Sequence, residues 1–146
     1  MKWVLVAALS LSLAACGSSV PLAPSEEDAA GKRFDAPPTG KVAFYLVRPS
    51  KFNFAYAINV SVGQRMAGSL GGESWLRVDV EPGKQDVRCQ GENTDATLVE
   101  ANAGEIRFVL VRPNMGWSSA RCSVQEVDAV LGRSYVMSSR RVQEIR

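Results

Sequence analysis

Apolar and polar side chains alternate over much of the chain, a pattern that is typical of half-buried β-strands. Residues 56–62 alternate in this way and residues 66–70 form the return strand. The pattern therefore predicts a hairpin with a two-residue turn at Gly63-Gln64. Further strands, bounded by Gly, Pro and Asn turns, are predicted at residues 75–80, 87–89, 96–101 and 120–127.

Two segments are apolar on both faces, at residues 42–47 and 106–111. A strand of this kind is covered on both sides, so we expect these two segments in the interior of a sheet. About eight short strands without helical crossovers predict an all-β fold, a single antiparallel β-sandwich of the immunoglobulin-like or transthyretin-like kind. A small closed barrel is the alternative.

A short helix is expected at each end of this sandwich. Ser25-Glu26-Glu27-Asp28 has the form of a capping box and predicts a helix that reaches about Phe34. Asp128 is placed to cap a second helix that reaches about Ser139. Because glycine is a poor helix former, Gly132 is expected to weaken this second helix.

The first residues have the pattern of an export signal. An apolar run over residues 3–15 follows Lys2, and it is shorter than the roughly 20 residues that a helix needs to cross a bilayer. The run ends on Leu13-Ala14-Ala15-Cys16-Gly17, which resembles the lipobox of bacterial lipoprotein precursors. The resemblance implies that residues 1–15 are a cleaved signal peptide and that the Cys16 thiol is acylated. A retained transmembrane helix and a plain secretory signal beside an unrelated cysteine are the alternatives.

The residues after the lipobox predict where the protein lies and how it is organised. Gly17 stands where lipoproteins retained at the inner membrane usually have aspartate, so the resemblance implies the periplasmic face of a bacterial outer membrane. The small, polar and Pro-rich residues 16–24 are expected to be a flexible tether. Residues 25–39 then form a helical and Pro-rich lead-in, and residues 40–146 form the sandwich.

Charge and residue content exclude several function classes. The chain has 17 Lys and Arg against 15 Asp and Glu, a balance that argues against a nucleic-acid partner. It has no histidine, so a general base would have to be a perturbed Lys, Asp or Glu. No catalytic motif stands out, and lone cysteines cannot complete a zinc site. We therefore expect no enzyme activity, no cofactor and no metal; a secreted enzyme without histidine is the alternative.

The cysteine count predicts one disulfide. With Cys16 acylated, Cys89 and Cys122 remain as a pair in an exported chain, where oxidising conditions favour a bridge between them. Two buried free thiols are the alternative.

An internal repeat marks a candidate binding patch. Residues 44–50 and 108–114 share Phe, Leu, Val, Arg and Pro at the same spacing. Because proline cannot donate a ladder hydrogen bond, it is expected to end each strand and to place the preceding arginine at the edge of the sheet. If the two strands run parallel, both arginines lie at the same end. The predicted patch consists of Arg48, Arg112, Phe52, Phe54 and Trp117. In the alternative, the aromatic side chains cap the core and the arginines only extend past it to solvent.

Three further segments carry a family resemblance: EDAAGKRF at residues 27–34, AFYLVRP at residues 43–49 and VEPGK at residues 80–84. With the lipobox, they resemble the bacterial lipoproteins grouped as domain of unknown function 2846, over nearly the whole chain after the signal. Val62-Gly63-Gln64 replaces the Asp-Gly hairpin turn that the family usually has. The family brings no activity with it.

These observations together predict a cell-envelope lipoprotein whose sandwich is a non-catalytic binding or structural module. Besides the membrane, its expected partner is an envelope protein. A glycan-binding or peptidoglycan-binding lipoprotein is the alternative, because exposed aromatic side chains beside arginine also suit sugars and anionic polymers.

Overall fold

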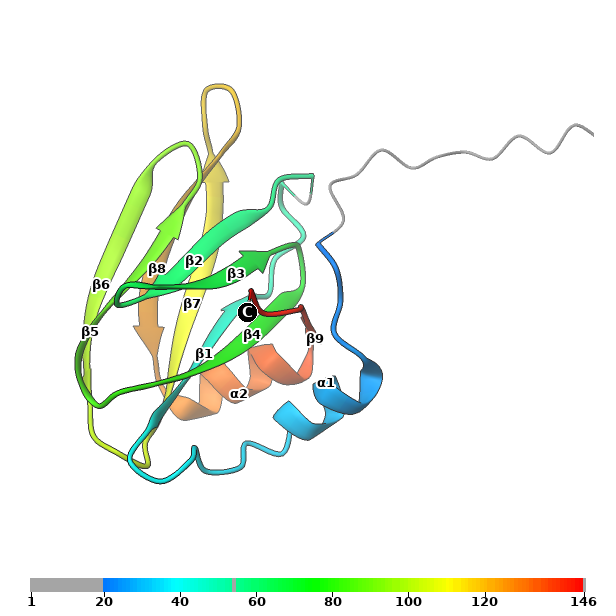
Figure 1. The fold of residues 1–146 in the computed structure, drawn as a ribbon. Helices are drawn as coiled ribbons and strands as arrows, with labels where there is room; N and C mark the ends of the chain where they lie inside the picture. Colours follow the sequence, from blue (N-terminus) through cyan, green and yellow to red (C-terminus); the bar gives the residue numbers. More distant parts are fainter. Residues whose placement is uncertain (1–19, 54, 146) are drawn as a thin grey trace, which may run out of the picture.

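The structure, a computed structural model, describes residues 20–53 and 55–145. Figure 1 shows two sheets packed against each other, with helices beside one of them. Neither helix in the described part of the chain is long and apolar enough to cross a membrane. The elements are α1 (Ser25–Gly31), β1 (Val42–Arg48), β2 (Ile58–Val62), β3 (Arg65–Leu70), β4 (Ser74–Val80), β5 (Gly83–Gln90), β6 (Thr94–Ala101), β7 (Ile106–Met115), β8 (Ala120–Val127), α2 (Ala129–Met137) and β9 (Arg140–Arg141).

The strands form a sandwich of a five-stranded sheet, in the order β8-β7-β1-β4-β9, and a four-stranded sheet, in the order β3-β2-β5-β6. The predicted sandwich is confirmed at this level, and so is the β2–β3 hairpin with its turn at Gly63-Gln64. The expectation of a purely antiparallel fold is wrong, because β1 pairs in parallel with β7, and β4 pairs in parallel with β9. A parallel pair needs a long connection, and four of the five strands between β1 and β7 belong to the four-stranded sheet.

Strand β1 is buried on both faces, as its sequence predicts. One face contributes Phe44 and Leu46 to the core between the two sheets. The other face contributes Tyr45, whose ring packs on Trp75 and Phe108 with centroids 5.5 and 5.3 Å apart. Helices α1 and α2 cover this second cluster, so the five-stranded sheet is the middle layer of three (Figure 1).

Helix α2 is capped as predicted and lies very close to β7. The Asp128 side chain accepts a hydrogen bond from the backbone N–H of Leu131, at 2.9 Å. A Cβ atom at Gly132 would lie 2.3 Å from Cγ of Phe108, so only glycine allows this approach. Gly132 weakens the helix by propensity, but it is the residue through which the helix reaches the sheet.

Helix α1 begins differently from the prediction. Its N-cap is Pro24, with no side-chain cap, so the expected capping box at Ser25 is wrong. Asp28 instead accepts hydrogen bonds from Nε1 of Trp75 at 3.1 Å and from the backbone N–H of Arg141 at 2.7 Å. The acid that was expected to close the first turn therefore docks the helix on the sheet.

Residues 20–24 lie along the end of the chain. Leu22 forms a bridge with Val142, and the backbone N–H of Ala23 donates to the carbonyl of Arg141 at 2.9 Å. The prediction of a flexible tether is therefore wrong for residues 20–24, because the edge beside β9 offers them backbone partners. Residues 16–19 lie outside the described part of the chain.

The predicted disulfide is confirmed between Cys89 and Cys122, whose Cα atoms are 6.2 Å apart. It joins β5 of one sheet to β8 of the other. Both backbone polar groups of Cys122 also bond the side chain of Asn93, at 2.8 Å for the N–H and 3.0 Å for the carbonyl. Covalent and hydrogen bonds thus close the sandwich along this edge.

Candidate binding surface

Arg48 is the largest charged side chain in the core, with no exposed surface. Its Nη1 donates to the carbonyls of Tyr56 and Leu70, at 2.6 and 3.1 Å. Its Nη2 donates to the carbonyls of Phe52 and Asn53, at 2.9 and 2.8 Å. Burial lowers the pKa of this guanidinium, although arginine stays charged in proteins. The side chain therefore holds the loop after β1 in place from inside.

The predicted pairing of Arg48 with Arg112 in one exposed patch is wrong. In the parallel pairing of β1 with β7, Val47 lies opposite Leu110. Arg48 therefore lies at the level of Val111, one residue before Arg112, and its side chain points to the core between the two sheets. A shift of one residue sends a side chain to the opposite face of a sheet. Arg112 is exposed, and its Nη1 donates to Oε1 of Gln125 at 3.3 Å.

The prediction that proline ends each strand holds for β1, which ends at Arg48, and is wrong for β7. The strand continues to Met115, and Pro113 lies opposite Cys122 in the pairing with β8. Because Cys122 directs its backbone groups to Asn93, away from β7, this is a non-hydrogen-bonded position of the ladder. The missing N–H of proline therefore costs no ladder bond, and the β7–β8 hairpin extends past the end of β1 (Figure 1).

A carboxylate holds the turn between β7 and β8. Glu92 accepts the backbone N–H groups of Trp117 at 2.9 Å, Ser118 at 2.8 Å and Ser119 at 2.9 Å. A Cβ atom at Gly116 would lie 2.0 Å from the carbonyl oxygen of Ser119, so the turn is too tight for any other residue. The turn is thus held by hydrogen bonds within the chain itself.

Exposed apolar side chains gather at this end of the molecule. Trp117 is 98% exposed and Met115 73%, and in the loop after β1 Phe52 is 47% and Tyr56 42% exposed. We call these four residues the aromatic end. The Asn53 side chain donates to the carbonyl of Asn114 at 3.3 Å, which links the loop to the hairpin.

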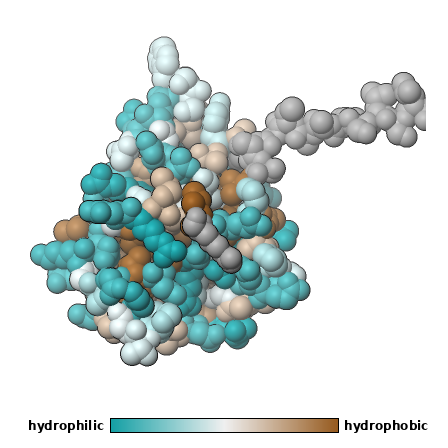
Figure 2. All heavy atoms as spheres, viewed as in Figure 1, coloured by the Kyte–Doolittle hydropathy of each residue, from teal (hydrophilic) through white to brown (hydrophobic). Residues whose placement is uncertain are grey.

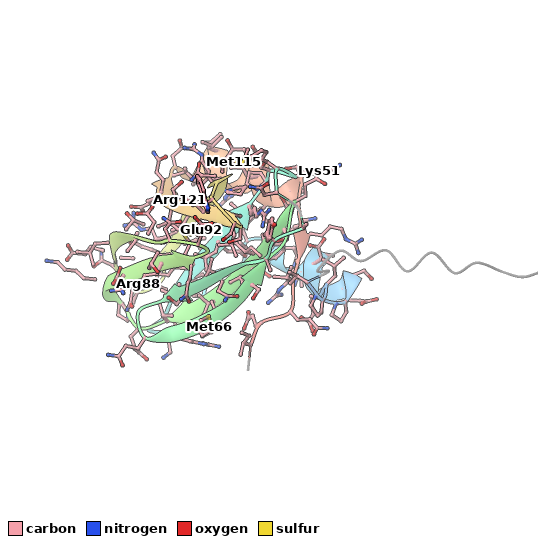
Figure 3. All side chains as sticks on the ribbon, turned by 90° about the horizontal axis from the view of Figure 1, so that it is seen from above. Lys51, Met66, Arg88, Glu92, Met115 and Arg121 are labelled. Carbon is pink, nitrogen blue, oxygen red and sulfur yellow. A yellow bond between two sulfur atoms is a disulfide. The ribbon has the colours of Figure 1, made fainter. Side chains whose placement is uncertain are left out.

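The figures show the surroundings of the aromatic end. In Figure 3, Met115, Arg121 and Glu92 lie together at the hairpin, and Lys51 lies on the neighbouring loop, whereas Arg88 and Met66 lie on the other sheet. Figure 2 shows a largely hydrophilic surface on the strands below the projecting turn. Two of the predicted patch residues, Phe52 and Trp117, are thus exposed here; Phe54 lies outside the described residues.

Two hollows elsewhere on the surface are lined by paired charges. One depression of about 630 Å³ lies between β7, β8 and α2, and there Arg107 bonds both Glu105 at 2.8 Å and Glu126 at 3.0 Å. A second, of about 330 Å³, contains the Arg77–Asp79 pair at 3.0 Å. No group of metal-ligating side chains occurs within residues 20–53 and 55–145. The aromatic end therefore remains the better candidate for binding.

The role of Glu92 in holding the β7–β8 turn was not predicted from the sequence. This residue lies in a polar turn, Gly91-Glu92-Asn93-Thr94, and its three amide donors come 25 to 27 residues later in the chain. An acid in a turn is usually exposed to solvent without a partner. Only the closing of β5 and β6 against β8 brings this one to the hairpin, so no local signal could have identified it.

We expect the Glu92 carboxyl to titrate far below its ordinary range. The three backbone N–H groups lower its pKa from 4.5 to about 2. Since the folded pKa is the lower one, the stabilisation of the turn is complete above the ordinary value and is lost as the pH falls towards 2. The amide NMR shifts of Ser118 and Ser119 should follow this titration. In Glu92→Gln the transition should vanish, and a midpoint near 4.5 in the unmodified protein would contradict the assignment.

In comparisons with known proteins, no protein-family model, no curated protein and no solved structure matches the chain.

Proposed function

We propose that the chain is a cell-envelope lipoprotein, acylated at Cys16, whose sandwich is a non-catalytic binding or structural module. The observation that carries the proposal is the Cys89–Cys122 disulfide. The chain has three cysteines, so this bridge leaves Cys16 as the one thiol available for a lipid. Stable disulfides form in exported proteins and are rare in the cytosol, so the bridge also supports export.

The finer parts of the proposal rest on resemblance. Gly17 after the cysteine favours the outer membrane, and the segments at residues 27–34, 43–49 and 80–84 favour the family of domain of unknown function 2846. An immunoglobulin-like or transthyretin-like arrangement of the sandwich belongs to the same proposal.

The state of the acidic side chains favours binding over catalysis. Asp79 is paired with Arg77 at 3.0 Å, and Glu92 accepts three amides that lower its pKa to about 2. A general base works best with a pKa near the operating pH, and Glu92 is far from it. A glycan-binding lipoprotein is the second candidate, because the almost fully exposed indole of Trp117 is a flat surface on which a sugar ring can stack.

The anchor is tested by mass spectrometry of the mature N-terminus. We expect a chain that begins at Cys16 and carries acyl groups on that residue. In Cys16→Ser, the acylation site is lost, so residues 1–15 should remain or the protein should leave the membrane fraction. The double variant Cys89→Ala/Cys122→Ala is the matched control and should keep its lipid. An unmodified Cys16 in the natural chain, or cleavage at another position, would contradict the lipoprotein proposal.

A further inference from the structure

The first described residue, Val20, lies near the loop after β1. Val20 packs against the core, and a Cβ atom at Gly71 would lie 3.5 Å from its Cγ2 atom. Gly71 follows Leu70, whose carbonyl is held by Arg48 together with the loop after β1. Figure 1 shows the start of the described chain near this loop, on the half of the molecule from which the β7–β8 hairpin projects.

The chain between a lipid and the domain is short. Residues 20–24 are fixed along the C-terminal segment, so only residues 17–19 separate Cys16 from the fold. Four Cα steps of about 3.8 Å span at most about 15 Å. If Cys16 carries a membrane-embedded lipid, as the proposed function states, Val20 lies within this distance of the lipid surface. The aromatic end is then on the membrane-facing side of the domain.

The chemistry of the aromatic end matches a lipid interface. Tryptophan is enriched where lipid headgroups meet acyl chains. Trp117 and Met115 are both exposed at the β7–β8 turn, which hydrogen bonds to Glu92 hold in place. Arg121, exposed on the hairpin just behind the turn, can meet anionic headgroups. The turn at the other end of β7, Asn102-Ala103-Gly104, is exposed but has no aromatic side chain.

We propose that the β7–β8 turn is a second membrane contact, in which Trp117 and Met115 enter the interface of the leaflet that holds the Cys16 lipid. The inference rests on the proposed lipoprotein function. A lipid alone leaves the domain free to rotate about its tether, whereas two contacts fix its orientation. The surface at the opposite end, around Lys41 and residues 102–105, then faces away from the membrane, where a soluble partner can reach it.

The experiment uses the chain from residue 16, which contains both sheets, both helices and the disulfide. Cys16 is its only free thiol, so a maleimide lipid attaches there alone, in vesicles of phosphatidylethanolamine and phosphatidylglycerol. This chain has two tryptophans, the buried Trp75 and the exposed Trp117. With brominated acyl chains, most of the Trp117 emission should be quenched, and in plain vesicles it should shift to shorter wavelength. Trp117→Phe, which keeps Trp75, should show neither change.

The matched control moves the indole to the other end of β7. Ala103→Trp in the Trp117→Phe chain carries an exposed tryptophan on the opposite turn, and it should not be quenched. Quenching of both positions alike, or of neither, would overturn the inference. A third outcome would also overturn the inference: the unsubstituted chain shows no quenching by brominated lipid, and Trp117→Ala loses binding to peptidoglycan. The turn would then be a glycan site. Since the lipid is attached chemically, failure of acylation in cells would refute the proposed function without changing this result.

Discussion

Arg48→Ala is expected to lower the free energy of unfolding by about 3 kcal/mol or more, whereas Arg112→Ala should change it by less than about 0.5 kcal/mol. The two arginines occupy the same place in the repeated motif and differ in environment. Arg48 is completely buried and bonds four carbonyls, while Arg112 is exposed and bonds one side chain. Truncating Arg48 leaves these carbonyls without their donor and opens a cavity, and each effect is destabilising.

Urea unfolding followed by the emission of Trp75 measures both variants, in the chain from residue 16 with Trp117→Phe, so that Trp75 is the one tryptophan that remains. Arg48→Lys is the intermediate case, because an ammonium keeps the charge but cannot span four acceptors as the guanidinium fork does. If Arg48→Ala were as mild as Arg112→Ala, the buried network would not hold the loop after β1. The aromatic end would then lack the support that we assign to it.

Much of the fold could be predicted because its signals are local. The period-two pattern gave the strands and the β2–β3 hairpin, and the apolar run at residues 42–47 gave a strand covered on both faces. Asp128 is recognisable as a helix cap from its own position, and the disulfide follows from the count of cysteines. None of these inferences requires knowledge of which strands are neighbours.

The register between strands could not be predicted in this way. The repeat aligns Phe44 with Phe108, but in the sheet Phe108 pairs with Tyr45. Equivalent motif residues therefore face opposite sides, and Arg48 is buried while Arg112 is exposed. Sequence similarity between two strands carries no information about a shift of one residue between them, because both alignments bury apolar side chains on a sheet that is covered on both faces.

Long-range backbone pairing was missed for a related reason. Strand β9 has two residues, Arg140 and Arg141, which is too short to show any period. The bridge between Leu22 and Val142 joins opposite ends of the chain. The continuation of β7 through Pro113 depends on the register with β8, which places Pro113 opposite Cys122, whose backbone groups bond Asn93. Each case depends on a partner that is distant in sequence, and a local pattern cannot show it.

Loss of the disulfide is expected to destabilise the protein by about 3.5 to 4 kcal/mol in the chain-entropy model, because the bridge closes a long loop in the unfolded chain. Cys89 and Cys122 are 33 positions apart, and both are buried. The loop contains β6 and β7, so the bridge ties both sheets of the sandwich together. Reduction of the natural protein removes the link but keeps the sulfur atoms, whereas Cys89→Ala/Cys122→Ala also removes their packing.

Urea unfolding of the oxidised, reduced and doubly substituted proteins separates these contributions. Reduction should give most of the loss, and the alanine variant should add a smaller packing term of about 1 kcal/mol or less per removed sulfur. Asn93→Ala is the matched control at the same edge: it keeps the bridge and removes the hydrogen bonds to Cys122, so it should cost about 1 to 2 kcal/mol. A reduced protein as stable as the oxidised one would mean that packing alone closes this edge. It would also weaken the case for export, because a sandwich that does not depend on its disulfide folds equally well in a reducing compartment.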